Sequence, residues 1–388
     1  MVNNKKIKIA FLSTYPPREC GLATFTQDLI TAMDNIGTIN TNVIAINSME
    51  NCVYDSKVIA EIGQHEQVDY LKVAERLNGS DIDLLVIEHE YGIFGGEYGD
   101  YILDLINNIE IPVVTTLHTI LSEPNIKQRL IINTLGKRSA KVITMASNTK
   151  HLLQSVYGID PEKIEVIHHG VPKKQIQPRE SLKKKYGYEN RQIISTFGLI
   201  GPSKGIEHGI EAISKVVKEN RDVLYLILGQ THPALKEEGR SYRNKLEELV
   251  KRLNLKENVK FINKYLSKDE IIEYLQLSDI YMTPYLGKDQ AVSGTMAYAV
   301  GYGKAIVSTP YLYAEEMLSG GGGLLAKFNN PNSLADCIKY IIQNPDKKAK
   351  MEKDTIKLGM TMYWDKVAKC YIEVFLNIIK SASKMGVA

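Results

Sequence analysis

The chain has 388 residues, more than one ordinary hydrophobic core supports, so two domains of comparable size are expected. With 44% hydrophobic residues, 24% charged residues and a net charge of +3, the composition is that of a globular protein and does not indicate a nucleic-acid partner. The four cysteines are scattered and no run of 18 apolar residues occurs, so we expect reduced thiols in a soluble cytoplasmic protein, with peripheral membrane contact left open.

The first half of the chain alternates short β-branched runs with helical patterns. Strands are predicted at 7–13, 42–46, 83–88, 112–118, 142–146 and 164–167. Helical patterns lie between these strands, for example at 25–33 and 98–109. Such alternation is typical of βαβ units, whose parallel sheet is covered by helices on both faces.

A polar, lysine-rich interval at 173–191 interrupts this pattern, and we interpret it as a solvated linker. The alternation then restarts. Strands are predicted at 193–197, 223–228, 259–262, 280–283 and 305–308, with helices at 242–253, 268–277 and 333–342. The sequence therefore predicts an α/β protein of two doubly wound Rossmann-like domains that face each other across a cleft, with ligands at the carboxyl ends of the strands.

The domain boundaries follow from this interval and from the end of the chain. Residues 362–379 form an amphipathic pattern that contains the only tryptophan, Trp364, and we expect a helix that crosses back to the first domain. The N-terminal domain is then expected to comprise 1–172 and 363–388, and the C-terminal domain 192–362.

Residues 197–205, FGLIGPSKG, join a predicted strand to a predicted helix. Backbone N–H groups at such a turn, the helix dipole and a lysine charge all favour a bound anion. We therefore predict a phosphate-binding loop; its members are Gly198, Gly201, Ser203 and Lys204. The alternative is a solvated lysine in an ordinary turn.

Two further turns are candidates for ligand contact. Ser293, Gly294 and Thr295 open a predicted helix, where small residues admit a ligand and hydroxyls can donate to phosphate or sugar oxygens; N-capping is the alternative. Gly21 lies between the first strand and the first helix, in a loop that can close over phosphates or the acceptor. The alternative for Gly21 is a turn glycine that needs a positive φ.

Polar side chains also follow the predicted strands of the first domain. His118 ends one strand, and Glu88 and Glu90 end another, so we expect all three at the ligand-binding edge. One of the two carboxylates is a candidate general base, with an ion-paired loop as the alternative. His168 and His169 are adjacent, so they point to opposite faces of a strand and predict no metal site.

The order and spacing of these motifs resemble the retaining nucleotide-sugar glycosyltransferases of family 4, which have the GT-B fold. The resemblance covers nearly the whole chain. It is carried by STYPPRECGLATFTQDL at 13–29, TLHT at 116–119, IEVIHHGV at 164–171, FGLIGPSKG at 197–205 and YAVGYGKAIVST at 298–309. It implies transfer of a hexose from a nucleoside diphosphate sugar to a carbohydrate or glycan acceptor, with no metal or other cofactor.

The resemblance also assigns roles to the candidate residues. The glycine loops, Lys204 and the segment 293–295 are expected to bind the donor in the C-terminal domain, whereas the acceptor binds to the N-terminal domain. His118 is expected to hydrogen-bond the donor's sugar or its leaving phosphate. The turn at 261–265 is expected to recognise the base through its backbone.

The sequence departs from the family pattern at three positions. The arginine of the phosphate loop is replaced by Leu199. The family's Glu-x7-Glu pair, whose members contact the donor sugar and the ribose, is replaced by Gln290 and Tyr298, and no glutamate occurs between 280 and 310. Gln290 can still hydrogen-bond a sugar, and Tyr298 still offers a hydroxyl.

These departures leave several functions open. The expected donor is GDP-mannose, with UDP-glucose as the alternative. An inverting transferase would need a base, for which Glu88 and Glu90 are the candidates. A glycan phosphorylase, a nucleotide-sugar epimerase and a non-catalytic binding protein also remain compatible with the sequence.

Overall fold

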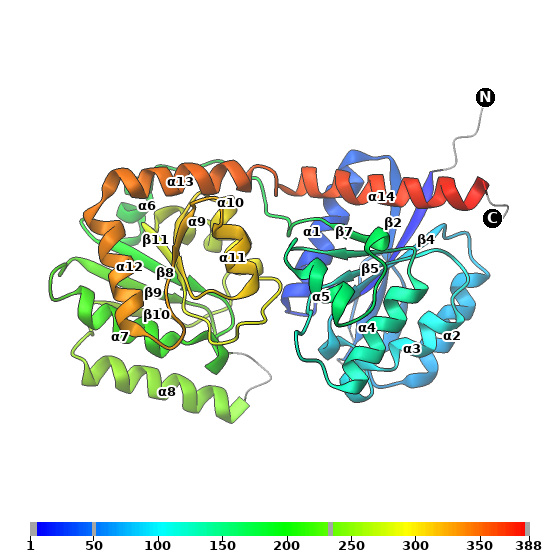
Figure 1. Ribbon diagram of the computed structural model, residues 1–388, viewed down its shortest axis with the longest axis horizontal. Helices are drawn as coiled ribbons and strands as arrows, with labels where there is room; N and C mark the ends of the chain where they lie inside the picture. Colours follow the sequence, from blue (N-terminus) through cyan, green and yellow to red (C-terminus); the bar gives the residue numbers. More distant parts are fainter. Residues whose placement is uncertain (1–5, 49–51, 232–235, 385–388) are drawn as a thin grey trace. The chain divides into compact units, whose positions relative to one another are not determined.

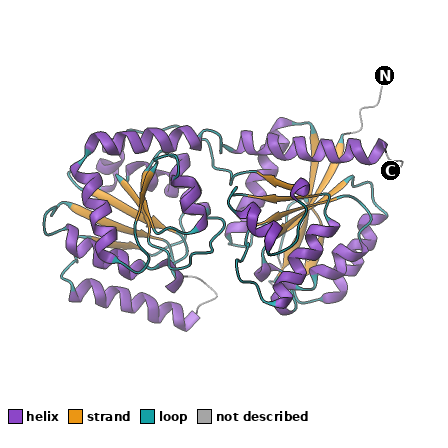
Figure 2. Cartoon of the chain, viewed as in Figure 1, coloured by secondary structure: helices purple, strands orange, loops and turns teal. Residues whose placement is uncertain are grey.

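The computed structural model describes residues 6–48, 52–231 and 236–384. The chain folds as two compact units. Unit 1 comprises Met1–Gly170 and Met362–Ala388, and unit 2 comprises Val171–Thr361. Each unit contains a parallel sheet with helices packed around it, as the strands and helices in Figure 2 show. The predicted fold class, with two Rossmann-like parallel sheets, is confirmed.

Unit 1 is built on a seven-stranded sheet of order β3-β2-β1-β4-β5-β6-β7, of which β2, β4, β5 and β7 are labelled in Figure 1. The strands are β1 Ile7–Ser13, β2 Ile39–Asn47, β3 Val58–Gly63, β4 Leu84–His89, β5 Val113–Leu117, β6 Lys141–Thr144 and β7 Ile164–Val166. The helices are α1 Gly21–Ile36, α2 Gln67–Asn78, α3 Ile102–Asn108, α4 Ile126–Arg138, α5 Thr149–Ser155 and α14 Trp364–Lys384, with 3₁₀ turns η1 Tyr91–Ile93, η2 Glu97–Gly99 and η3 Pro161–Lys163. Every residue of β4 and β5 is buried, as expected for strands of a parallel sheet that is covered on both faces.

The C-terminal helix α14 belongs to unit 1, where it packs against α1. Its residue Phe375 is fully buried and meets Phe11 of β1 edge-on, with ring centroids 6.3 Å apart. Trp364, at the start of α14, lies so close to Gly170 that a Cβ atom at Gly170 would overlap the indole. A glycine is therefore required at the end of the segment that follows β7.

Unit 2 is built on a six-stranded parallel sheet of order β10-β9-β8-β11-β12-β13. The strands are β8 Gln192–Phe197, β9 Val223–Leu228, β10 Val259–Ile262, β11 Ile280–Thr283, β12 Ala305–Ser308 and β13 Gly323–Leu325. The helices are α6 Arg179–Tyr186, α7 Ile206–Val216, α8 Lys236–Arg252, α9 Lys268–Leu277, α10 Gly294–Gly301, α11 Leu312–Leu318, α12 Pro331–Gln343 and α13 Pro345–Gly359, with the 3₁₀ turn η4 Pro202–Lys204.

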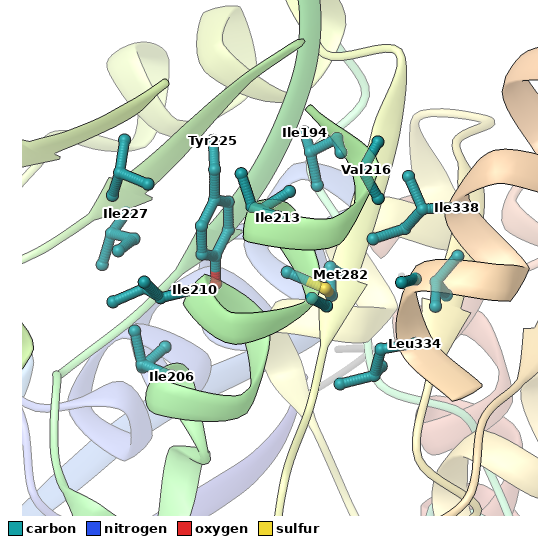
Figure 3. Packing of buried hydrophobic residues seen from close by; sticks show 14 of the residues in the cluster. Ile194, Ile206, Ile210, Ile213, Val216, Tyr225, Ile227, Met282, Leu334 and Ile338 are labelled. Atoms are coloured by element: carbon teal, nitrogen blue, oxygen red, sulfur yellow. The ribbon is translucent and has the colours of Figure 1, made fainter. Parts of the chain in front are cut away.

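Helix α7 supplies much of the core of unit 2 (Figure 3). Ile206, Ile210 and Ile213 recur at helical spacing and pack toward the sheet, where Tyr225 of β9 is fully buried. Fully burying one such aliphatic side chain stabilises the fold by about 1.5–3 kcal/mol. The hydroxyl of Tyr225 is 2.9 Å from Thr196 Oγ1, so its polar atom is satisfied inside this core. The loop that precedes α7 is thus anchored by a rigid helix.

The interpretation of 173–191 as a solvated linker is wrong for the part that forms α6, which belongs to unit 2. Lys183 is only 5% exposed, and its Nζ lies 2.9 Å from the buried carboxylate of Asp279. The other carboxylate oxygen of Asp279 lies 3.5 Å from Arg179 Nη1. The basic residues of this segment suggested a solvated linker because their acidic partner lies far away in the sequence.

Two strands, β3 and β13, were not predicted from the sequence. Both lie at the edge of their sheets, and neither has a continuous buried run. In β3 only Ile62 is buried. An edge strand pairs with a neighbour along one side only and is less buried than a central strand, so its apolar pattern is weak.

Among the described residues, every helix is too short or too polar to cross a lipid bilayer.

Candidate active site

The loop after β8 has the backbone geometry of a tight strand-to-helix turn. Gly198 has φ +131° and Gly205 has φ +59°, conformations that favour glycine. A Cβ atom at Gly205 would also overlap the carbonyl oxygen of Pro284. Between the two glycines, η4 carries Ser203 and Lys204, and α7 begins directly after Gly205. The predicted order of strand, glycine turn, lysine and helix is therefore present.

The start of α10 lies beside this loop. A Cβ atom on Gly198 would come within 3.3 Å of Thr295 Cγ2, so the two segments are in contact. Ser293 caps the helix by accepting a hydrogen bond from the Met296 amide at 3.3 Å. The Ser293 and Thr295 hydroxyl oxygens are 3.2 Å apart. Ser293 therefore caps α10, and this role leaves donor contact by the same segment possible.

Lys204 is held against a tyrosine that the sequence analysis did not single out. Its Nζ lies 3.9 Å from the centroid of the Tyr285 ring. The Tyr285 hydroxyl is 2.9 Å from Thr295 Oγ1, which connects Lys204 to the start of α10. No short motif marks Tyr285, because its importance comes from contacts with two distant segments.

Gln290 and Tyr298, which replace the family's two glutamates, lie on either side of Ser293 in the sequence. Gln290 is half-buried, and its amide donates to the carbonyl of Val292 at 3.1 Å. Tyr298 is 9% exposed and meets Phe197, the last residue of β8, edge-on at 6.2 Å. Tyr298 therefore lies beside the end of β8, whereas Gln290 lies in the segment before α10, and the roles of both toward a donor remain predictions.

In unit 1, Glu88 and His118 form a pair at the carboxyl ends of neighbouring strands β4 and β5. His118 Nε2 is 2.8 Å from Glu88 Oε2, and the Thr116 hydroxyl donates to Glu88 Oε1 at 3.5 Å. Glu88 is fully buried, whereas the His118 side chain is 12% exposed. The Glu88 carboxylate thus lies behind the imidazole and has no exposed surface with which to touch an acceptor. This geometry suits orienting His118, and a general-base role for Glu88 stays a prediction.

Glu90 and Gly21 occupy the other predicted positions in unit 1. Glu90 accepts from the Tyr91 amide at 3.0 Å and from the Thr119 hydroxyl at 2.5 Å, so both of its oxygens have partners. Gly21 is the first residue of α1, and a Cβ atom there would meet no described atom within 4 Å. Gly21 is not among the glycines with positive φ, so its interpretation as a turn glycine that needs one is wrong. Its contact with a ligand stays a prediction.

His89 is fully buried in unit 1, and His169 is half-buried there. Both His89 ring nitrogens are buried without a hydrogen-bond partner among the described residues, and the ring stacks on Phe94 at 5.7 Å. Burial, with a smaller contribution from His118, lowers the pKa of His89 to about 3. Burial likewise lowers the pKa of His169 to about 4. Both are therefore neutral structural histidines at physiological pH.

Replacing His89 with leucine is expected to reduce the sensitivity of the protein to acid. A histidine whose folded pKa lies below its usual 6.5 leaves the unfolded state with more protons, so the free energy of unfolding decreases as pH falls below 6.5. Each pH unit corresponds to about 1.4 kcal/mol, so the unaltered protein should lose about 2 kcal/mol more than His89→Leu between pH 7.5 and 5.0. Denaturant unfolding at both pH values measures this difference.

The matched control for that experiment is His151→Leu, because His151 is exposed on α5. This variant should lose as much stability as the unaltered protein over the same pH range. An equal loss in His89→Leu would contradict the assignment of acid sensitivity to His89.

The described residues bring no three histidine, cysteine, aspartate or glutamate side chains close enough to hold a metal ion. The candidate residues are instead a lysine and hydroxyl groups in unit 2 and, separately, a histidine–carboxylate pair in unit 1.

Comparison with known families explains this arrangement. Residues 178–358 match the family model described as glycosyl transferases group 1, and residues 69–175 match the model described as Glycosyltransferase Family 4. The chain belongs to this family. Family 4 enzymes are retaining, have the GT-B fold and use nucleotide sugars, so the predicted class of enzyme is confirmed.

Individual relatives are distant but cover most of the chain. An uncharacterised glycosyltransferase of Methanocaldococcus jannaschii is 22% identical over 379 residues, which is 95% of this chain and 99% of that protein. The crystal structure of HepE from Anabaena with UDP and glucose has a TM-score of 0.75 at 18% identity and covers 96% of this chain and 100% of HepE. Sucrose-phosphate synthase from Thermosynechococcus elongatus has a TM-score of 0.79 at 13% identity, with 97% and 100% coverage.

Membership of family 4 favours a retaining glycosyltransferase over the other functions that the sequence left open. A glycosyltransferase of a retaining family does not need the base that an inverting reaction demands, which agrees with the buried position of Glu88. The phosphorylase, epimerase and binding-protein alternatives have no such support from the family models.

Proposed function

We propose that this family 4 glycosyltransferase transfers a hexose from a UDP-sugar to a carbohydrate or glycan acceptor, without a metal ion. The observation that carries the proposal is the contact between the Gly198–Lys204 loop and the start of α10, which gathers one cation and several hydroxyl and amide donors at one place. The similar HepE structures contain UDP, UDP with glucose and UDP-glucose, which supports UDP as the nucleotide.

In this proposal the residues of unit 2 bind the donor diphosphate. The diphosphate gains charge as the bond to the sugar breaks, so fixed donors at that position stabilise the transition state more than the ground state. Lys204 supplies the full positive charge, while Ser293, Thr295 and the amides of the glycine loop supply hydrogen bonds. Gln290 is proposed to contact the sugar and Tyr298 the ribose.

The residues of unit 1 are proposed to act on the sugar and the acceptor. Glu88 holds the His118 ring by its Nε2 atom, which fixes the orientation and leaves Nδ1 for a hydrogen bond to the donor's sugar or leaving phosphate. Glu90 and the loop that contains Gly21 are proposed to contact the acceptor. Holding both substrates in one orientation converts a bimolecular step into an effectively unimolecular one.

Thermal unfolding in the presence of nucleotides tests the donor assignment. A ligand that binds only the folded protein adds about 2.7 kcal/mol of stability when it is present at 100 times its Kd. We expect UDP and UDP-glucose to raise the melting temperature, and GDP-mannose, GDP and inorganic phosphate to have little effect. A shift with GDP and GDP-mannose alone would replace the donor assignment with a mannosyl donor. A shift with phosphate alone, and with no nucleotide, would overturn the proposed function.

A further inference from the structure

Two loops of unit 2 lie against each other with a fixed register. The amide of Leu286 donates to the carbonyl oxygen of Ser203 at 3.1 Å. Gly205 lies two residues after Ser203, and Pro284 lies two residues before Leu286. These two residues approach so closely that a Cβ atom on Gly205 would overlap the carbonyl oxygen of Pro284. These two contacts bracket one pair of residues, Lys204 and Tyr285, which must therefore lie opposite each other. The pairing is set by the backbone and not only by side-chain rotamers.

The side chains continue this pairing. The Lys204 ammonium lies over the face of Tyr285, 3.9 Å from the ring centroid. The ring of Tyr285 also stacks on the ring of Tyr311, with the two centroids 5.2 Å apart and an interplanar angle of 18°. Tyr285 is only 1% exposed and Tyr311 is fully buried, so the ring beneath the lysine cannot move aside easily. The negative face of an aromatic ring attracts a cation, most strongly where water is excluded.

The Tyr285 hydroxyl extends the connection to α10. It is 2.9 Å from Thr295 Oγ1, which in turn is 3.2 Å from Ser293 Oγ. One buried tyrosine thus contacts the cation of the phosphate loop through its face and the start of α10 through its hydroxyl. A flexible lysine loses side-chain entropy when it binds an anion, and a lysine already held in place loses less.

We propose that Tyr285 is a positioning residue that holds Lys204 ready for the donor diphosphate. This inference rests on the proposed function, because it assumes that Lys204 binds the diphosphate. Tyr285 is too deeply buried to contact the donor itself and acts on it only through Lys204, whereas the contact of its hydroxyl with Thr295 holds the ring in place. In a loop where Leu199 stands in place of a second cation, one immobilised lysine has to supply the charge alone among the residues 197–205.

A double-mutant cycle with UDP as the probe tests the inference. Tyr285→Leu removes the ring and is expected to weaken UDP binding about 3- to 30-fold in calorimetric titration. Tyr285→Phe keeps the ring and should bind UDP within about 3-fold of the unaltered protein. In a Lys204→Met background, Tyr285→Leu should cause less than about a 2-fold further loss, because the group through which it acts is gone. Tyr340→Leu, an exposed tyrosine on α12, is the matched control and should not change UDP binding.

The outcomes separate this inference from the proposed function. Equal weakening by Tyr285→Leu with and without Lys204 would show that the tyrosine acts by packing, and unchanged binding in Tyr285→Leu would show that it does not act at all; either overturns the inference alone. Failure of the unaltered protein to bind UDP or GDP would overturn the proposed function and this inference with it. If Tyr285→Leu does not fold, Tyr285→Met fills more of the same volume without an aromatic face, and the same comparison applies.

Discussion

Replacing Lys204 with methionine is expected to lower kcat/KM for the donor about 100- to 1,000-fold. The methionine side chain has a similar length, so the change removes the charge and little of the volume. Deleting one preorganised donor to a developing negative charge typically costs this much in rate. Because Lys204 is partly exposed on a surface loop, the melting temperature should change little. Steady-state release of the nucleoside diphosphate, measured with saturating acceptor, gives the value.

The control for this prediction is Lys218→Met, because Lys218 is an exposed lysine after α7 in the same unit. Its kcat/KM should equal that of the unaltered enzyme. A Lys204→Met enzyme with normal turnover would show that this loop does not bind the diphosphate, and that its geometry serves only to join β8 to α7.

Replacing His118 with alanine is expected to lower both stability and turnover. The variant removes the hydrogen-bond partner that lies 2.8 Å from the fully buried Glu88 carboxyl, and a buried polar group left without a partner typically costs about 1–3 kcal/mol of unfolding free energy. Turnover should also fall about 100-fold, because a hydrogen-bonding group for the donor's sugar or leaving phosphate is lost. Denaturant unfolding and donor turnover measure the two effects separately.

A second substitution distinguishes the structural from the catalytic role of this pair. In the double variant Glu88→Met/His118→Ala the buried carboxyl is removed together with its partner, so most of the lost stability should return, whereas turnover should stay low. His151→Ala, at an exposed histidine of α5, should change neither quantity. Recovery of full turnover together with stability would show that His118 serves the fold and not the reaction.

Much of the fold was predictable because it depends on local pattern. The runs that became β1, β4, β5, β8 and β9 are rich in apolar residues and mostly buried, as is typical of strands in a covered parallel sheet. Their bounds agree with the prediction to within a few residues. The glycine loop before α7 was predictable for a similar reason. Nine consecutive residues contain the left-handed glycine, the lysine and the residue that precedes the helix.

The rest of the site depends on residues that are distant in sequence. Glu88 and His118 are separated by 30 residues and meet because β4 and β5 are neighbours in the sheet. No pattern in either segment indicates that Glu88 is buried or that its partner is His118. Tyr285 follows β11 and reaches Lys204 only because two loops pair across the ends of adjacent strands.

Charge and burial were the properties that sequence described least well. Lys183 was interpreted as solvated and is buried against Asp279, 96 residues further along the chain. His89 gives no local sign of its burial, yet its pKa is about 3. The sequence by itself determined the family, the class of reaction and the alternation of strands and helices, since these depend on residues close together in the chain. The tertiary structure decided which groups are buried, which are paired and which can meet a substrate, because those properties arise only when distant segments share one environment.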